Sequence, residues 1–159
     1  MDDNYQAGDT GDENGINRTE DLIDFIENAS MPLHWVNGSG IIIWANQAEL
    51  DLLGYTKEEY LNKHISNFHL DKDAIDVIMK RLIGKETIKD CPATLVCKNG
   101  TTKYVLVNSN ALWRDGEFIH TRCFTKDITG LVKEQEKATE FIRNLESEIA
   151  RLKSSQTGN

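Results

Sequence analysis

The most informative part of the sequence is residues 40–48, GIIIWANQA, which precede a short leucine-rich stretch that ends at Gly54. Residues 41–44 are β-branched or aromatic and predict a strand. Asn46 follows almost directly, and Asn is a preferred residue for capping the start of a helix. Gly54 favours the end of that helix, and residues 56–59, TKEE, match a capping box that opens another. This part of the chain therefore predicts a strand followed by two short helices.

Further elements are predicted on both sides of this stretch. Residues 33–36, LHWV, form a second β-rich run, and the intervening NGSG predicts a hairpin between the two runs. Before the hairpin, residues 20–30 are expected to form a helix, because their apolar residues recur at helical spacing. The same spacing predicts a longer helix between Asp71 and Gly84.

Three longer strands are predicted in the second half of the chain, at residues 89–98, 103–113 and 117–127. Asn99-Gly100 and Asp115-Gly116 separate them, and both dipeptides are typical of tight hairpin turns with positive φ at the two turn residues. The complete order is two strands, several short helices and a three-stranded meander. An α+β fold with helices on one side of an antiparallel sheet fits this order.

The sequence resembles the PAS domain family over about residues 20–130. The first half of the resemblance is carried by GIIIWANQA and LLGYTKEE, and the second half by Lys98-Asn99-Gly100, Asp115-Gly116 and Asp127-Ile128-Thr129. The resemblance implies a PAS fold, with a five-stranded antiparallel sheet in the order 2-1-5-4-3 and short helices on one face. An N-terminal helix and a C-terminal coiled-coil helix would flank it. Asn62 stands where most members have Gly, so a positive φ is expected there.

The resemblance is strongest to PAS modules of bacterial sensor histidine kinases, because of HWV at residues 34–36 and RCFTKDIT at residues 122–129. Many PAS domains hold a small pocket between the helices and the sheet, and they sense ligands, light, redox state or partners. Six strand residues are expected to face such a pocket: Trp35, Ile43, Tyr104, Leu106, Asn108 and Phe124. A polar ligand or water would then satisfy the buried amides. In the alternative interpretation, this strand face is exposed and its Asn residues are surface residues.

Flavin and haem are not expected as cofactors. The light-sensing PAS subclass carries a reactive Cys in an Asn-Cys-Arg-Phe-Leu-Gln motif, whereas residues 62–68 here read NKHISNF. Haem-binding members use a His on the long helix, and residues 71–83 contain none. His69 lies just before that helix and could ligate iron, but a hydrogen bond to the helix start is the favoured role. An unidentified small ligand still fits the family. The three cysteines are expected to be small buried strand residues.

Residues 128–153 carry a heptad pattern of apolar residues. The a positions are Ile128, Gln135, Ile142 and Ile149, and the d positions are Leu131, Ala138, Leu145 and Leu152. Ile at a with Leu at d favours a parallel two-stranded coiled coil, in which the polar Gln135 would set the register. The segment is therefore predicted to be a dimeric output helix. Alternatively, it is a single amphipathic helix folded onto its own sheet.

Composition and motifs argue against several functions. A net charge of −8 disfavours binding to nucleic acid. Neither an apolar run long enough for membrane insertion nor a signal peptide is visible, so a cytoplasmic location is expected. The chain has no catalytic motif, phosphate-binding loop or metal-ligand spacing that would indicate an enzyme. The expected organisation is a disordered acidic tail (1–17), a PAS domain with its N-terminal helix (18–127), a coiled-coil helix (128–153) and a second disordered tail (154–159).

These patterns together predict a sensory and signal-transduction module. The module would bind a small ligand or a partner and pass the signal to the dimeric C-terminal helix through the junction Asp127, Ile128 and Thr129. A histidine kinase or a response regulator of a two-component system is the expected class of signalling partner. The alternatives are a ligand-free dimerisation scaffold and a haem-based gas or redox sensor.

Overall fold

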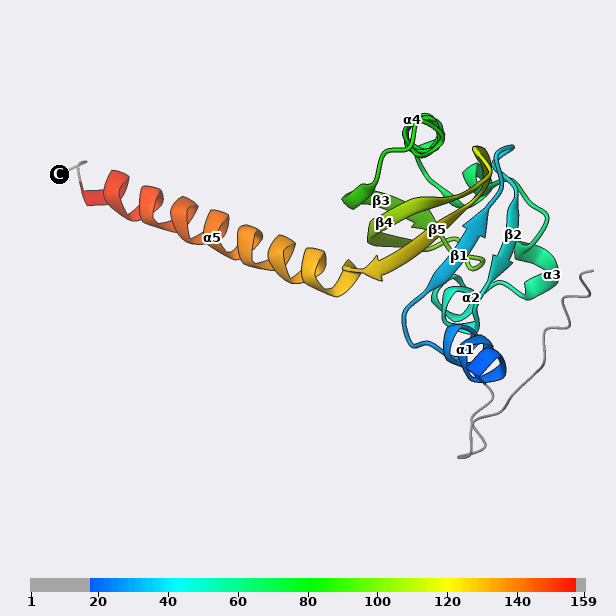
Figure 1. Ribbon diagram of the computed structural model, residues 1–159. Coiled ribbons are helices and arrows are strands. Elements are labelled where there is room, and N and C mark those ends of the chain that lie inside the picture. Colours follow the sequence, from blue (N-terminus) through cyan, green and yellow to red (C-terminus); the bar gives the residue numbers. More distant parts are fainter. Residues whose placement is uncertain (1–17, 157–159) are drawn as a thin grey trace, which may run out of the picture.

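The structure is a computed structural model that describes residues 18–156, and its centre is a five-stranded antiparallel sheet in the order β2-β1-β5-β4-β3 (Figure 1). This is the order that the family resemblance implies. The strands are β1 (Leu33–Val36), β2 (Ile42–Ala45), β3 (Ile88–Val96), β4 (Thr102–Arg114) and β5 (Glu117–Asp127). The predicted strands are confirmed, with ends that differ by one residue in β2 and β4 and by one or two residues in β3.

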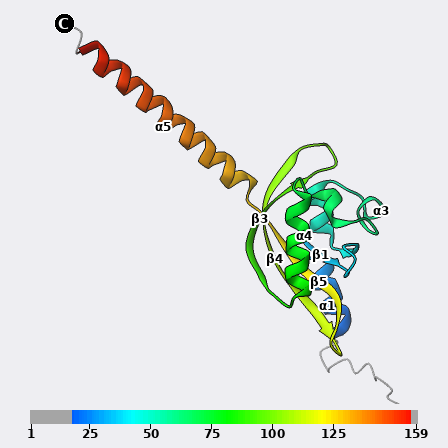
Figure 2. The same ribbon diagram turned by 90° about the horizontal axis from the view of Figure 1, so that it is seen from above.

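The helices are α1 (Arg18–Glu27), α2 (Gln47–Leu53), α3 (Lys57–Tyr60), the short 3₁₀ helix η1 (Ile65–Phe68), α4 (Lys72–Ile83) and α5 (Thr129–Gln156). The segment between β2 and β3 holds α2, α3, η1 and α4, and α3 and α4 lie on one side of the sheet (Figure 2). In contrast, α5 projects away from the sheet in both views (Figures 1 and 2).

The helix ends follow the capping signals in the sequence. Asn46 caps α2 by accepting a hydrogen bond from the Glu49 N–H, and Gly54 ends the helix at φ 77°. Thr56 and Glu59 form the predicted capping box of α3, and Asp71 caps α4. These caps satisfy N–H groups that a helix leaves unpaired at its first turn, which is why the short helices begin where they do.

The turns confirm most of the predicted backbone geometry. Asp115 and Gly116 both have positive φ, at 51° and 84°. At the other hairpin, positive φ occurs only at Gly100, so the expectation for Asn99 was wrong. That loop is longer, because the bond from the Cys97 N–H to the Thr101 carbonyl closes it around an extra residue. Asn62 has a φ of 60°, as expected for a position that Gly usually occupies.

The core lies between the sheet and the helices of the β2–β3 segment. The buried side of α4 is formed by Ile75, Ile78 and Leu82, which share the predicted helical spacing. They pack in one cluster with apolar residues of the strands, including Ile42 and Val105, neither of which has any exposed surface. The burial of this cluster holds α4 over the sheet.

Asn46 ties three elements together in addition to capping α2. Its side-chain oxygen also accepts a bond from the Leu33 N–H at 3.0 Å. Its amide nitrogen donates to the carbonyls of Ile26, Ala29 and Met31 at 3.3, 3.3 and 3.0 Å. The residue is fully buried, so its amide joins α2, β1 and the end of α1 with the segment that follows it.

The C-terminal helix is longer than predicted. It continues through Ser154 and Ser155 to Gln156, so the expected disordered tail was wrong for residues 154–156. The hydroxyls of Ser154 and Ser155 donate to the carbonyls of Arg151 and Leu152, which satisfies acceptors in the last turn. The predicted tail at residues 1–17 and the remainder at 157–159 lie outside the described residues.

Asn46→Asp should lower the free energy of unfolding by about 3 kcal/mol, because it places an oxygen opposite three carbonyl acceptors in the core. Urea denaturation followed by circular dichroism would measure the loss. Asn99→Asp is the matched control, since the exposed Asn99 side chain uses its oxygen as an acceptor for Thr101 and an aspartate keeps that role. Equal stability of the two variants would contradict the role given to Asn46.

Candidate functional site

The six residues predicted to face a pocket do not line the core cavity, so this prediction was wrong. Ile43 and Phe124 are 41% and 44% exposed, and Tyr104 is also exposed. Leu106 and Asn108 alternate along β4 with the buried Val105, Val107 and Ser109, so they lie on the opposite face of the sheet. The alternative interpretation, an exposed strand face, is the correct one for Asn108, whose amide donates to the carboxylate of Asp90.

The error is a shift of one residue, which exchanges the two faces of a strand. On β1, His34 and Val36 are buried, while the predicted Trp35 stacks on His120 with 4.4 Å between ring centroids. On β2, Ile43 falls at a bulge between the pairs Trp35–Trp44 and Val36–Ile42. Apolar residues occur on both faces of this sheet, so hydrophobicity alone does not show which face is turned towards the core.

A buried polar cluster lies on the inner face. His34 Nδ1 and Glu49 Oε1 are 2.9 Å apart, and the Tyr60 hydroxyl donates to the same carboxylate oxygen at 2.8 Å. Glu49 has no exposed surface, and His34 is 5% exposed. The strand β1 supplies the imidazole, α2 the carboxylate and α3 the phenol. The cluster therefore joins the sheet to both short helices.

The cluster is charged at neutral pH. Burial disfavours the charged form of His34, but Cys123 and Glu49 outweigh it and raise the pKa of His34 well above 6.5. Burial likewise raises the pKa of Glu49, but His34 and Tyr60 outweigh it, so the pKa of Glu49 lies below 4.5 overall. Burial and the neighbouring Glu49 raise the pKa of Tyr60 well above 10, so it remains a donor. The pair is thus an imidazolium and a carboxylate.

A small cavity adjoins this cluster. Its volume is about 20 Å³, enough for about one water molecule. His34, Glu49, Tyr60 and Ser109 line it together with Thr125, and apolar residues of α4 and β3 close the other end. Within residues 18–156, the atoms Glu49 Oε2, Ser109 Oγ and Thr125 Oγ1 are buried without a hydrogen-bond partner. Such atoms are costly to bury unpaired, so this end of the cavity is suited to a polar guest.

His69 also lines the cavity, from the segment between η1 and α4. It does not cap α4, because that role belongs to Asp71. Burial and the positive charge of His34 lower the pKa of His69 to about 4, against smaller opposing effects of Glu49 and Asp71. The imidazole is therefore neutral at physiological pH.

Sequence reasoning missed the polar cluster altogether. A signal for Glu49 was present, because it lies four residues before Leu53 and beside Leu50 on the side of α2 that faces the core. No comparable signal marks Tyr60 or His34, because their pairing joins residues that are far apart in the sequence.

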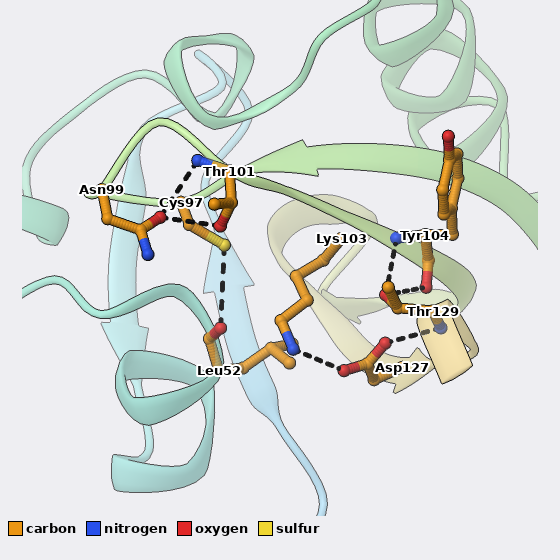
Figure 3. Close-up of polar contacts among 8 residues, drawn as sticks. All are labelled: Leu52, Cys97, Asn99, Thr101, Lys103, Tyr104, Asp127 and Thr129. Carbon is orange, nitrogen blue, oxygen red and sulfur yellow. Dashed lines mark hydrogen bonds and ion pairs between the residues drawn. The ribbon is translucent and has the colours of Figure 1, made fainter. Parts of the chain in front are cut away.

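Two of the three predicted junction residues, Asp127 and Thr129, lie together at the end of β5 (Figure 3). Asp127 accepts a bond from the Thr129 N–H at 2.8 Å and pairs with Lys103 at 3.0 Å. The Thr129 hydroxyl accepts from the Tyr104 N–H at 2.9 Å, and the Ile128 N–H donates to the Tyr104 carbonyl. The start of α5 is thus bonded to β4 as well as continuous with β5.

The part of the chain that forms the sheet and its helices matches a known protein family. The profile of the family described as PAS domain matches residues 29–130. The chain belongs to the PAS domain family. The match begins just after α1 and ends at the start of α5, so both helices flank the PAS domain.

Solved PAS structures share this fold. The chain resembles the PAS domain of an HTR-like protein from Haloarcula marismortui, with 23% identity and a TM-score of 0.62 over 69% of this chain and 91% of that one. A domain of a sensory box sensor histidine kinase/response regulator from Geobacter sulfurreducens is 20% identical, with a TM-score of 0.60 over 69% of this chain and 93% of that one. An RNA-binding Light-Oxygen-Voltage receptor is 17% identical, with a TM-score of 0.67 over 82% of this chain and 38% of that one. At these identities the likeness shows the fold alone. No curated protein sequence matches the chain.

None of the helices between residues 18 and 156 combines the length and apolar character needed to cross a bilayer. In the same part of the chain, His, Cys, Asp and Glu side chains form no group of three or more that could hold a metal ion.

Stability should depend on pH through His69. Its folded pKa of about 4 lies below the ordinary 6.5, so the unfolded chain binds the proton first as the pH is lowered, and stability decreases as the pH falls from about 6.5 towards 4. Relative to His69→Gln, the free energy of unfolding of the wild type should decrease by about 2 kcal/mol when the pH is lowered from about 7 to about 5. Urea titrations of both proteins at each pH would measure the difference. Parallel pH profiles would show that His69 is not a buried neutral imidazole.

Proposed function

We propose that this chain is a sensory PAS module that binds a small polar ligand in its core cavity and transmits binding to a dimeric α5. The observation that supports the proposal most strongly is the group of unpaired buried atoms Glu49 Oε2, Ser109 Oγ and Thr125 Oγ1 around the cavity. A ligand that carries hydrogen-bond donors would satisfy them and remove their desolvation cost.

The path from cavity to output is short. Thr125 faces the cavity, and Asp127 and Thr129 follow two and four residues later at the junction. A shift of β5 that accompanies ligand binding would therefore move the bonds between the start of α5 and β4. Transmission requires that the ligand bind one arrangement of this junction more tightly than the other.

The proposed ligand is neither flavin nor haem. Both groups need several hundred cubic ångströms, roughly the volume of drug-sized sites, whereas the cavity here holds about 20 Å³. The apolar residues of α4, including Ile75, Ile78 and Leu82, fill the space between that helix and the sheet. The ligand class that fits is a very small polar molecule.

Dimerisation through α5 is supported by its uncovered apolar side chains. Leu131, Ile142, Leu145, Ile149 and Leu152 remain about half exposed or more, although all five occupy core positions of the heptad. The helix does not fold back onto its own sheet (Figure 1), which disfavours the alternative of a docked amphipathic helix. A second copy of α5 would bury this stripe.

The proposed setting is two-component signalling in the cytoplasm. The Geobacter sulfurreducens neighbour is a domain of a sensor histidine kinase/response regulator, and a chain of this class would present α5 to such a partner. The chain would act as a sensor and not as an enzyme. A dimerisation scaffold that binds nothing is the second candidate, because the cavity is small enough to be filled by water alone.

Native mass spectrometry of the purified protein should reveal a small molecule bound at one copy per chain. Ser109→Ala should abolish this binding without destabilising the ligand-free protein, because the Ser109 hydroxyl has no partner in residues 18–156. Thr121→Val is the matched comparison, because the Thr121 hydroxyl accepts a hydrogen bond from the Val36 N–H at 3.0 Å. Loss of this hydroxyl should lower the free energy of unfolding by about 1–3 kcal/mol. Absence of any bound molecule would favour the scaffold.

Ile142→Asp combined with Leu145→Asp should convert a dimer to a monomer, since four like charges would meet in a narrow apolar seam. Asn144→Asp with Ser147→Asp adds the same charge outside the seam and should leave the dimer intact. Gln135→Ile should tighten the dimer. Light scattering gives the mass, and circular dichroism checks the fold. A double Asp seam variant that stays dimeric would show that another surface holds the dimer.

A further inference from the structure

Cys123 occupies a chemically distinctive place on the inner face of the sheet. In the strand register it lies directly opposite His34 on β1 and opposite Ser109 on β4. Side chains of directly opposed residues in antiparallel strands share one face, with Cβ atoms about 4.5–5.5 Å apart. Cys123 is 7% exposed and lines the core cavity together with both neighbours. A thiol, an imidazole and a hydroxyl are therefore aligned across three strands.

The imidazole is oriented by a further residue. Glu49 holds His34 Nδ1 at 2.9 Å, and Tyr60 donates to the same carboxylate oxygen at 2.8 Å. A nucleophile beside an imidazole that a carboxylate orients is the arrangement by which proteins activate cysteine and serine. A protonated imidazole next to a cysteine favours the thiolate, which is the reactive form of the side chain.

An independent observation indicates that a polar atom can be received beside the sulfur. Ser109 lies on β4 directly opposite Cys123, and Thr125 lies on β5 two residues after it. The two residues are 4% and 1% exposed, and their hydroxyls have no hydrogen-bond partner among the described residues. The other two cysteines lack this setting. The Cys97 thiol points to the Leu52 carbonyl at 3.9 Å, and Cys91 lies on β3, outside the core cavity.

We propose that Cys123 is a redox-reactive site that hydrogen peroxide oxidises to a sulfenic acid, with His34 as the proton donor to the leaving group. The reactivity stands on the geometry of the inner face alone. The use of this reactivity as a signal rests on the proposed sensory function. The input of the sensor would then be a small uncharged oxidant.

The step balances without another reagent. The Cys123 thiolate attacks one peroxide oxygen, a sulfur–oxygen bond forms and the oxygen–oxygen bond breaks. The leaving hydroxide takes the proton of the His34 imidazolium and departs as water. Sulfur is oxidised by two electrons, and the peroxide is reduced by two. Ser109 and Thr125 can then hydrogen-bond to the new sulfenic oxygen.

The size of the cavity selects the oxidant. A volume of about 20 Å³ admits a molecule of roughly the size of water or hydrogen peroxide and excludes peptide disulfides. A surface groove of about 420 Å³ between α4 and β3 shares His69, Ile75 and Ile78 with the cavity. These three side chains form a wall between groove and cavity, and their movement would admit a small neutral oxidant.

The test uses the full chain with Cys91→Ser and Cys97→Ser, so that Cys123 is the remaining thiol. Treatment with hydrogen peroxide, followed by a sulfenic-acid trap and peptide mass spectrometry, should label Cys123 in the folded protein. At a fixed pH near 6.5, His34→Gln should slow the reaction by about 10- to 100-fold, because the group that donates a proton to the leaving hydroxide is lost. His64→Gln is the matched control, because that half-buried imidazole lies outside the cluster and bonds Ser66.

A variant-free readout protects the test if His34→Gln does not fold. At one fixed pH, Cys123 should be labelled faster in the folded protein than in the same protein in urea, because only the fold holds together the groups that face His34: Glu49, Tyr60, His69 and Cys123. Equal rates, or labelling confined to the urea-unfolded chain, would overturn the proposal. A bound ligand with an unreactive Cys123 would overturn it and leave the sensory function standing. Oxidised Cys123 with an unchanged α5 dimer would support the reactivity and overturn its link to output.

Discussion

A carboxylate without solvent exposure lies at the centre of this domain, and the interaction of Glu49 with His34 is what makes that burial possible. An isolated charge in a protein core costs many kcal/mol, so each charge here depends on the other. The Tyr60 hydroxyl completes the coordination of the carboxylate. Because the three side chains come from α2, β1 and α3, their electrostatic requirement fixes how the helices sit on the sheet.

A buried ion pair is weak evidence for stability, since an apolar replacement of equal volume is often as stable. Its value here is positional. The pair holds an imidazolium against Cys123 and leaves one carboxylate oxygen facing a cavity. The unpaired hydroxyls of Ser109 and Thr125 belong to the same set of polar residues that a purely structural core would have replaced with Ala and Val. These departures from apolar packing are what distinguish the site from the rest of the core.

The strand β5 connects this site to both surfaces of the molecule. Its inner residues Cys123 and Thr125 contact the cavity, while Phe124 lies on the outer face, where it lines a groove with Phe25 of α1. Its last residue, Asp127, anchors the start of α5. A strand that is hydrogen-bonded on both sides moves as a unit with its neighbours, so a change at the sulfur or the hydroxyls has a mechanical route to the exit helix.

The sequence alone was sufficient for the elements and their order, except for the short helix η1, which it did not predict. Caps, turns and helical spacing are local, so Asn46, Thr56, Asp71 and Gly116 could be interpreted from their neighbours. The family resemblance supplied the strand order, and the heptad at the C-terminus could be counted directly. What the sequence could not supply was the inward face of the sheet. Alternation along a strand defines two faces, but Trp35 and Phe124 on one face are as apolar as Val36 and Val107 on the other.

Only the tertiary structure established which face is inside and which residues meet there. The contact between His34, Glu49 and Tyr60 joins three segments, and each looks ordinary in isolation: a histidine in a strand, an acidic residue in the first turn of a helix and a tyrosine at the end of another. Their chemistry arises from burial and proximity, and both depend on how the chain folds back on itself. Local signals and the family resemblance therefore predicted this protein's architecture, whereas long-range packing determined its site.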